Sequence, residues 1–264
     1  MPTRCTFPSH QARIPVKDLQ FAKALLALFL LGSLGSKAFA QGGASLAPAP
    51  GEKCSFHEFF HDTWAEGSQS VHGLKAIPGG AIRPRNLKWE LPILAATGIL
   101  IAEADLPADK RIQSAPLERS ADVGSNVGLG LEIGWGAISY GVGCGEHRGY
   151  LHNTGFKALF AMGTAGLEDL ALKLAFDRQY PAPGSTGEFW GGGKSFPSGH
   201  SATSFAFAAV VAHRYPHNRW IKWSAYALAT GVSLSRYPAK KHYLSDILAG
   251  ATVGYVTGNY LAGD

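Results

Sequence analysis

The short stretch Phe196–His200 has the residue types of an anion site with a proton donor. An uncharged run long enough for a helix follows it, so we expect a helix to begin there. The first N–H groups of a helix are free and lie at the positive end of its dipole, which favours an anion. Gly199 lets an anion approach the backbone, Ser198 adds a hydroxyl, and His200 can exchange a proton near neutral pH. Phosphoryl chemistry would use this combination.

A second stretch, Ser235–Asp246, contains a histidine and a carboxylate at helical spacing. His242 and Asp246 are four residues apart, so on a helix they share one face. The carboxylate could hold one ring N–H and leave the other nitrogen of the imidazole free to attack. Arg236 offers a fixed fork of donors for phosphate oxygens. The same spacing also occurs by chance in a surface turn before a helix, so the pattern alone does not decide.

The third stretch, Lys173–Pro181, lies at the end of an apolar segment that we expect to be a helix. Taken alone, Lys173 and Arg178 would be ordinary cationic side chains near a helix C-terminus. Together with the anion site, Arg236 and two histidines, they complete a set of groups for phosphoryl transfer that needs no metal.

The three stretches resemble the motifs of the type 2 phosphatidic acid phosphatase (PAP2) and vanadium haloperoxidase superfamily. Those motifs read K-x6-R-P, P-S-G-H and S-R-x5-H-x3-D. The second motif matches in full at Pro197–His200, and the third matches in full from Ser235 to Asp246. The resemblance covers about residues 86–264.

The resemblance implies a role for each matched position. His242 would attack phosphorus and form a phosphohistidine, with Asp246 orienting it. His200 would protonate the leaving alkoxide and later activate water. The groups that would hold the phosphate oxygens are Lys173, Arg236, the Ser198 hydroxyl and the Gly199 N–H. No metal and no cofactor is expected.

The first motif departs from the family pattern. Lys173 matches, but Tyr180 stands where the family has its arginine, directly before Pro181. Arg178 lies two residues earlier, where many members carry an additional arginine, and we expect it to bind phosphate in place of the missing one. Tyr180 itself could supply only a neutral hydrogen bond.

The elements that must position these residues are predicted to be helices. Apolar segments separated by glycine, proline and polar turns run from residue 91 to the C-terminus, and few stretches alternate at period two. The sequence therefore predicts an all-α bundle of six helices, and the resemblance implies that it is of the PAP2/haloperoxidase type. The expected helices are Leu91–Ala104, Val123–Cys144, Gly155–Phe176, Ser201–His213, Trp220–Ser235 and Tyr243–Leu261.

Three regions are expected along the chain. Residues 1–40 have a basic segment, an apolar run and Ala38-Phe39-Ala40, which predict a signal peptide, with an uncleaved anchor as the alternative. Residues 41–85 read as a linker and N-terminal arm, and residues 86–264 as the catalytic bundle. We therefore expect an exported protein, periplasmic or associated with the outer side of the inner membrane.

Composition limits the partners. The net charge of +5 suits an anionic substrate or an anionic membrane surface, and no block of Lys and Arg suggests nucleic acid. Mean hydropathy is only +0.01, and most uncharged stretches are shorter than the roughly 20 residues of a spanning helix. This favours a soluble or membrane-associated bundle over a multi-span protein. Cys54 and Cys144 could form one disulfide or remain as two thiols.

We therefore predict an exported PAP2-type phosphatase that hydrolyses phosphomonoesters, either of lipids or of soluble compounds. One alternative is vanadate-dependent halide oxidation on the same fold. Another is a weakened relative that only binds phosphorylated ligands, which Tyr180 suggests. A third is a zinc peptidase, because His57-Glu58-Phe59-Phe60-His61 has the spacing of a zinc site, although a covering helix explains that segment better.

Overall fold

The computed structural model describes residues 60, 63–64, 92–93, 95–106, 117–145 and 149–263. Within these ranges the chain forms six helical elements and no strand, which confirms the predicted all-α bundle. The elements are η1 (Leu100–Ala104, a π-helical segment), α5 (Glu118–Gly145), α6 (Gly149–Phe176), α7 (Gly199–Arg214), α8 (Arg219–Ser235) and α9 (Leu244–Ala262).

The predicted signal peptide and linker lie outside the described residues, except for residues 60 and 63–64. The same holds for His57 and His61. Among the predicted helices, α5 and α6 begin earlier than expected. The predicted bounds followed the apolar residues, whereas α5 begins with the three polar residues Glu118, Arg119 and Ser120.

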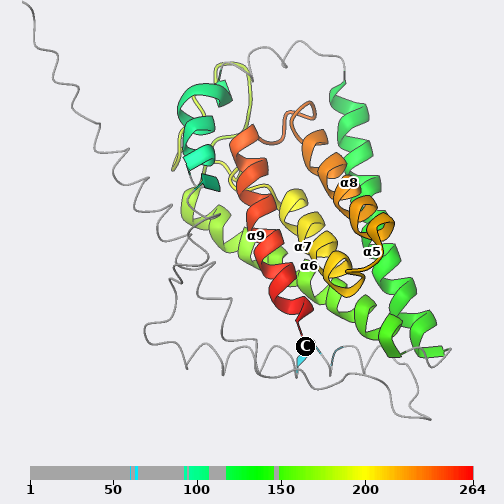
Figure 1. Cartoon of the computed structure of the whole chain (residues 1–264). Helices are drawn as coiled ribbons and strands as arrows, with labels where there is room; N and C mark the ends of the chain where they lie inside the picture. Colours follow the sequence, from blue (N-terminus) through cyan, green and yellow to red (C-terminus); the bar gives the residue numbers. More distant parts are fainter. Residues whose placement is uncertain are drawn as a thin grey trace, which may run out of the picture.

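Helix α7 lies at the centre of the bundle, where it packs against α6, α8 and α9 (Figure 1). Its buried residues are mostly alanine, serine and valine, which let neighbouring backbones come close. The closest approach is to α9, where Gly250, Gly254 and Gly258 face α7 at intervals of four residues. A Cβ on any of these glycines would overlap the backbone of α7 or of the residue that caps it. The pair is therefore held in one register.

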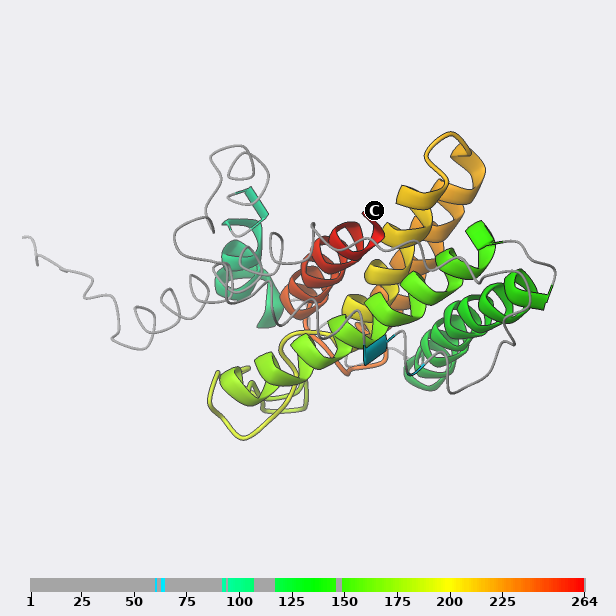
Figure 2. The same ribbon diagram turned by 90° about the horizontal axis from the view of Figure 1, so that it is seen from below.

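The remaining helices cover this central pair from two sides. Helix α5 packs against α6 and α8, while η1 lies beside α9 on the other side (Figures 1 and 2). Five helix ends meet at one end of the bundle: the starts of α5, α7 and α9 and the ends of α6 and α8. The C-terminus lies at the opposite end (Figure 1). All three motif stretches adjoin these helix ends.

Two further structural features concern possible membrane spans and a disulfide. In the described ranges, no helix combines the length and the apolar character needed to cross a bilayer. Cys144, close to the end of α5, is buried and disulfide-bonded, and the cysteine bonded to it lies outside the described residues.

Candidate active site

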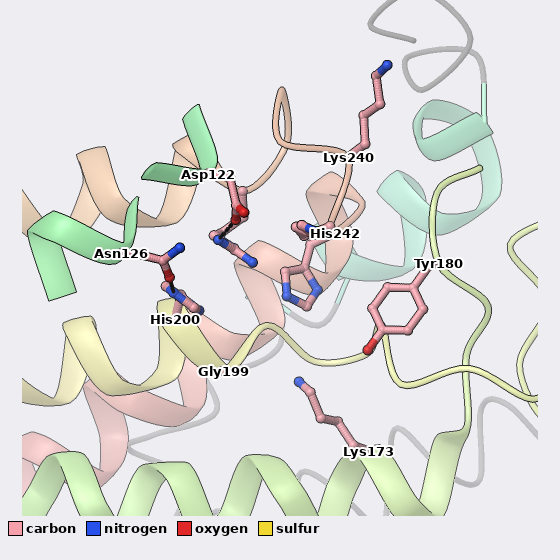
Figure 3. A pocket seen from close by; sticks show the side chains of 10 residues that line it. Asp122, Asn126, Lys173, Tyr180, Gly199, His200, Lys240 and His242 are labelled. Carbon is pink, nitrogen blue, oxygen red and sulfur yellow. Dashed lines mark hydrogen bonds and ion pairs between the residues drawn. The ribbon is translucent and has the colours of Figure 1, made fainter. Parts of the chain in front are cut away.

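A cavity of about 590 Å³ opens where the helix ends meet (Figure 3). Residues from all three motif stretches line it, which brings together most of the predicted site. These residues are Lys173, Gly199, His200, Arg236 and His242. Figure 3 also shows that α5, which carries none of the three motifs, contributes Asp122 and Asn126 to the same wall.

The predicted anion-binding turn forms at the start of α7. The helix begins at Gly199, with Ser198 in an extended conformation as its N-cap residue. The Ser198 hydroxyl does not cap the helix, and this buried oxygen has no hydrogen-bond partner among the described residues. At Gly199 a Cβ would come 2.7 Å from a carboxylate oxygen of Asp169, so glycine is needed for this close approach. The turn presents free N–H groups and a hydroxyl with hydrogen-bonding capacity left over.

His242 is buried, and its ring is oriented by a backbone carbonyl. Its Nδ1 lies 2.7 Å from the carbonyl oxygen of Ser195, whereas the nearest oxygen of Asp246 is 3.8 Å away. At this distance the expected direct hydrogen bond from His242 to Asp246 does not form. With Nδ1 engaged, Nε2 is the ring nitrogen left for the pocket. Burial lowers the pKa of His242, although the Asp246 carboxylate opposes this, so the imidazole is neutral and nucleophilic near neutral pH.

Hydrogen bonds also link Asp246 to His242 through Ser195. Its Oδ2 accepts a hydrogen bond from the Ser195 hydroxyl at 2.5 Å and another from the backbone N–H of Tyr243 at 2.9 Å. The first bond fixes the residue whose carbonyl holds His242, and the second fixes the start of α9. Ser195 precedes the P-S-G-H motif by only two residues, but no spacing rule marked it as part of the site.

Arg178 is not where the sequence prediction placed it. Its side chain is 2% exposed, and it donates to Asp246 at 2.5 Å, to Asp105 at 2.9 Å and to the carbonyl of Gly187 at 3.1 Å. Its guanidinium also lies over the rings of Phe189 and Tyr243. These donors are directed into the protein, and Arg178 does not line the cavity. Its geometry therefore does not fit the expected role as a phosphate ligand.

The cations that do line the cavity are partly engaged. Nη1 of Arg236 lies 2.7 Å from both Asp122 and Ser125, but its buried Nε has no partner among the described residues. Lys173 donates to Asp169 at 2.8 Å and to the carbonyl of Pro197. Each of these two cations thus keeps N–H groups for an anion in the cavity.

His200 faces the cavity from the first turn of α7, and Asn126 of α5 holds it. The Nε2 atom of His200 lies 2.9 Å from Oδ1 of Asn126. Burial, with the nearby charges of Arg236 and His242, lowers the pKa of His200 to about 4. Asp122 acts in the opposite direction. Without an anion in the site, His200 is therefore neutral over most of the physiological pH range.

Tyr180 occupies the place of the missing arginine and lines the cavity. Its hydroxyl is directed into the cavity on the side of Lys173 (Figure 3). Burial and the charges of Asp169 and Asp246 raise the pKa of Tyr180, so the phenol keeps its proton. At this position the cavity therefore has the neutral phenol of Tyr180 as a hydrogen-bond donor, where the motif has a charged arginine.

The comparisons with known proteins agree with the motifs. The model of the PAP2 superfamily matches residues 154–262, which span α7, α8, α9 and most of α6. Residues 154–262 of the chain are therefore similar to the PAP2 superfamily. The matched region contains every motif residue of the site, whereas α5 lies outside it.

Two relatives illustrate the similarity. A stretch of 65 residues is 38% identical to a lipid A 1-phosphatase of Porphyromonas gingivalis, covering 24% of this chain and 15% of that protein. A PAP2 type phosphatidylglycerolphosphate phosphatase from Bacillus subtilis, described as transmembrane, is 24% identical over 65% of this chain and 92% of its own, with a TM-score of 0.45. The fold class rests on the helices themselves rather than on this likeness.

Proposed function

We propose that the protein is a phosphatase that hydrolyses phosphomonoesters through a phosphohistidine at His242. The observation that carries this proposal is the cavity in which both motif histidines face the same space. Two buried polar atoms at this site, Oγ of Ser198 and Nε of Arg236, have no partner among the described residues. Buried donors of this kind are usually paired, and phosphate oxygens would pair them.

The reaction has two displacements at phosphorus. Nε2 of His242 attacks, the P–N bond forms, and the bond to the ester oxygen breaks as His200 gives that oxygen a proton. His200 then takes a proton from water, which attacks the phosphohistidine, and the P–N bond breaks to release phosphate. The charge on the phosphoryl oxygens is stabilised by Lys173, Arg236 and the free N–H groups at the start of α7.

Binding of the substrate allows His200 to take up the proton that it needs from solvent. In the ligand-free site the pKa of His200 is about 4, so at neutral pH the ring is neutral and cannot act as an acid. A bound phosphate places negative charge beside His200 and offsets Arg236 and the other cations that lower its pKa. Binding of phosphate is therefore coupled to uptake of a proton.

We infer that the substrate is a lipid phosphate and that the protein is exported. The similarity to a segment of a lipid A 1-phosphatase supports a lipid substrate. So do Leu167, Leu170 and Leu174, which are exposed on α6, the helix that carries Lys173. The disulfide of Cys144 supports export, because disulfides persist in oxidising compartments.

Hydrolysis of p-nitrophenyl phosphate by the purified protein tests the reaction. We expect activity that EDTA does not affect, that vanadate inhibits and that His242→Ala abolishes, whereas His217→Ala, a change in the loop between α7 and α8, leaves it unchanged. Equal inactivity of wild type and His242→Ala on a broad panel of phosphate esters would instead favour a phosphate-binding protein. Oxidation of bromide by the vanadate-loaded protein would favour a haloperoxidase.

A comparison of lipid and soluble phosphate esters tests the substrate class. We expect a higher kcat/KM for a lipid phosphate in mixed micelles than for glycerol phosphate. Replacing Leu170 and Leu174 by serine should lower the value for the lipid and leave that for glycerol phosphate unchanged. Equal effects on both substrates would contradict the lipid assignment.

A further inference from the structure

Two side chains on the same face of α5 contact the cavity residues Arg236, which directly follows α8, and His200 of α7. Asp122 lies 2.7 Å from Nη1 of Arg236, and Asn126 lies 2.9 Å from Nε2 of His200. The two are four residues apart, so one helical face presents both to the cavity (Figure 3). Helix α5 lies outside the part of the chain that the family model matches, so the matched motifs say nothing about this pair.

We propose that Asp122 and Asn126 are positioning residues, through which α5 orients Arg236 and His200 for the reaction and balances the charge around His200. This inference rests on the proposed phosphatase function. It assigns to α5 a part of the active site that the three motifs leave out.

Asn126 decides which nitrogen of His200 is used. The side-chain oxygen of Asn126 can only accept a hydrogen bond, so Nε2 of His200 carries a hydrogen in this contact. The neutral ring then has Nδ1 as its basic nitrogen, and a proton taken up there is the one to be passed to the leaving group. Loss of Asn126 would free the ring to rotate and to change tautomer.

Asp122 has two effects of opposite sign on the reaction. Its carboxylate holds the guanidinium of Arg236, and it is the only acidic side chain that faces His200 among the described charged neighbours of that ring, which are Arg236, His242, Lys173 and Asp122. Asp122 therefore favours the protonated ring, while its charge also competes with a phosphate for Arg236. Removing the charge of Asp122 should strengthen phosphate binding, and it should make His200 a less effective general acid because less of it is protonated.

Three substitutions separate these effects. Asn126→Asp puts a carboxylate beside Nε2 and should raise the pKa of His200 by about one to two units. Asp122→Asn should lower it and should also lower the inhibition constant of inorganic phosphate. Asn126→Ala should reduce kcat at least about tenfold, with little change in KM, because the acid is no longer held in place.

The matched control is Asn259→Asp. Asn259 is half-buried in the last turns of α9, at the other end of the bundle, where its side chain donates to the carbonyl of Tyr255. The same change of charge at this position should leave both the titration of His200 and the activity as in the wild type.

The experiment is an NMR titration of the histidine rings in the ligand-free full chain, with His200 assigned by the signal that His200→Gln removes. The pH profile of kcat/KM for p-nitrophenyl phosphate is measured in parallel. We expect the titration of His200 and the alkaline limb of the profile to move up in Asn126→Asp and down in Asp122→Asn. A purely structural role of α5 would not give shifts of opposite sign.

Two results would overturn the inference: His200 titrating in Asn126→Asp as it does in Asn259→Asp, or both α5 variants shifting it in the same direction. The titration does not depend on turnover. Opposite shifts in a protein that hydrolyses no phosphate ester would therefore support the positioning by α5 and refute the phosphatase.

Discussion

Arg178 and Arg236 are both paired with carboxylates, yet they belong to regions with different tasks. Arg178 lies behind the active site, where two aspartates, the Ser245 hydroxyl and a backbone carbonyl receive its hydrogen bonds. Arg236 lies in the cavity wall, where Asp122 and Ser125 share one of its nitrogens and the buried Nε has no partner among the described residues. An arginine can bind substrate only with the donors that the fold leaves over.

The two regions also differ in their balance of charge. Behind the site, Asp105 follows η1, Arg178 follows α6 and Asp246 lies in the first turn of α9, so one buried cation joins three parts of the chain. Burial alone would raise the pKa of Asp246, but Arg178, His242 and Ser195 together lower it. The cavity instead has more cations than acids in its wall, which suits an anionic ligand. The buried cluster stabilises the fold, and the cavity wall retains binding capacity.

The largest effect on stability should come from Arg178→Ala. This change leaves Asp105 and Asp246 buried without their cation, and breaking such a pair costs about 3–5 kcal/mol. Urea unfolding followed by circular dichroism would measure the loss. The control is Arg219→Ala in the exposed first turn of α8, which should change the free energy of unfolding by less than about 0.5 kcal/mol. Equal costs for the two variants would contradict the anchoring role of Arg178.

Arg236→Ala should have a large effect on activity and a smaller effect on stability than Arg178→Ala. Turnover of p-nitrophenyl phosphate should fall about 100- to 1000-fold, because a donor to the developing phosphoryl charge is lost. Its partner Asp122 is 35% exposed in its side chain and can be solvated by water, so the unfolding free energy should fall by less than in Arg178→Ala. Arg236→Lys should recover little activity, since lysine keeps the charge but not the fork of donors. Activity within a few-fold of wild type in Arg236→Ala would remove Arg236 from the site.

The contrast between the two arginines also shows what the sequence could predict. Helical periodicity and motif spacing placed the six helices and brought Lys173, His200, Arg236 and His242 into one cavity. They could not show whether the donors of an arginine are already hydrogen-bonded within the protein. Asp105, one of the acceptors of Arg178, lies 73 residues away in the chain. Nor could they find the α5 contacts, since apolar texture placed the start of that helix just after Asp122. Contacts between residues that lie far apart in the chain are not visible in local sequence spacing.

Helix α5 also contains a buried carboxyl that has no cation beside it among the described residues. Glu132 of α5 is fully buried, and its neighbour is the Ser204 hydroxyl at 2.6 Å. Burial raises the pKa of Glu132 to about 7, which the hydrogen bond from Ser204 only partly opposes. A raised pKa means that the folded protein holds this proton more tightly than the unfolded chain. The stabilisation is therefore complete below the unfolded value of 4.5 and is lost as the pH rises through about 7.

Glu132→Gln should remove this dependence on pH. Glutamine stays neutral, so the variant should become more stable than the wild type as the pH rises from 5 to 8, by roughly 2–3 kcal/mol at pH 8. Urea unfolding at several pH values would measure the difference. Glu118→Gln, at an exposed carboxylate in the first turn of the same helix, is the matched control. Parallel pH dependence of Glu132→Gln and wild type would show that Glu132 is not the titrating group.

A change at the α7–α9 contact should disturb both regions together. Gly254 faces the backbone of Ala202, and a Cβ there would force the two helices apart. Because α7 carries His200 and α9 carries Asp246, Gly254→Ala should lower the unfolding free energy by about 1–3 kcal/mol and reduce turnover as well. Gly231→Ala on α8 is the matched control, since a Cβ there meets nothing within 4 Å, and it should stabilise the helix by about 0.5–1 kcal/mol. If Gly254→Ala lowered stability but kept full turnover, the histidines would not depend on the packing of this pair.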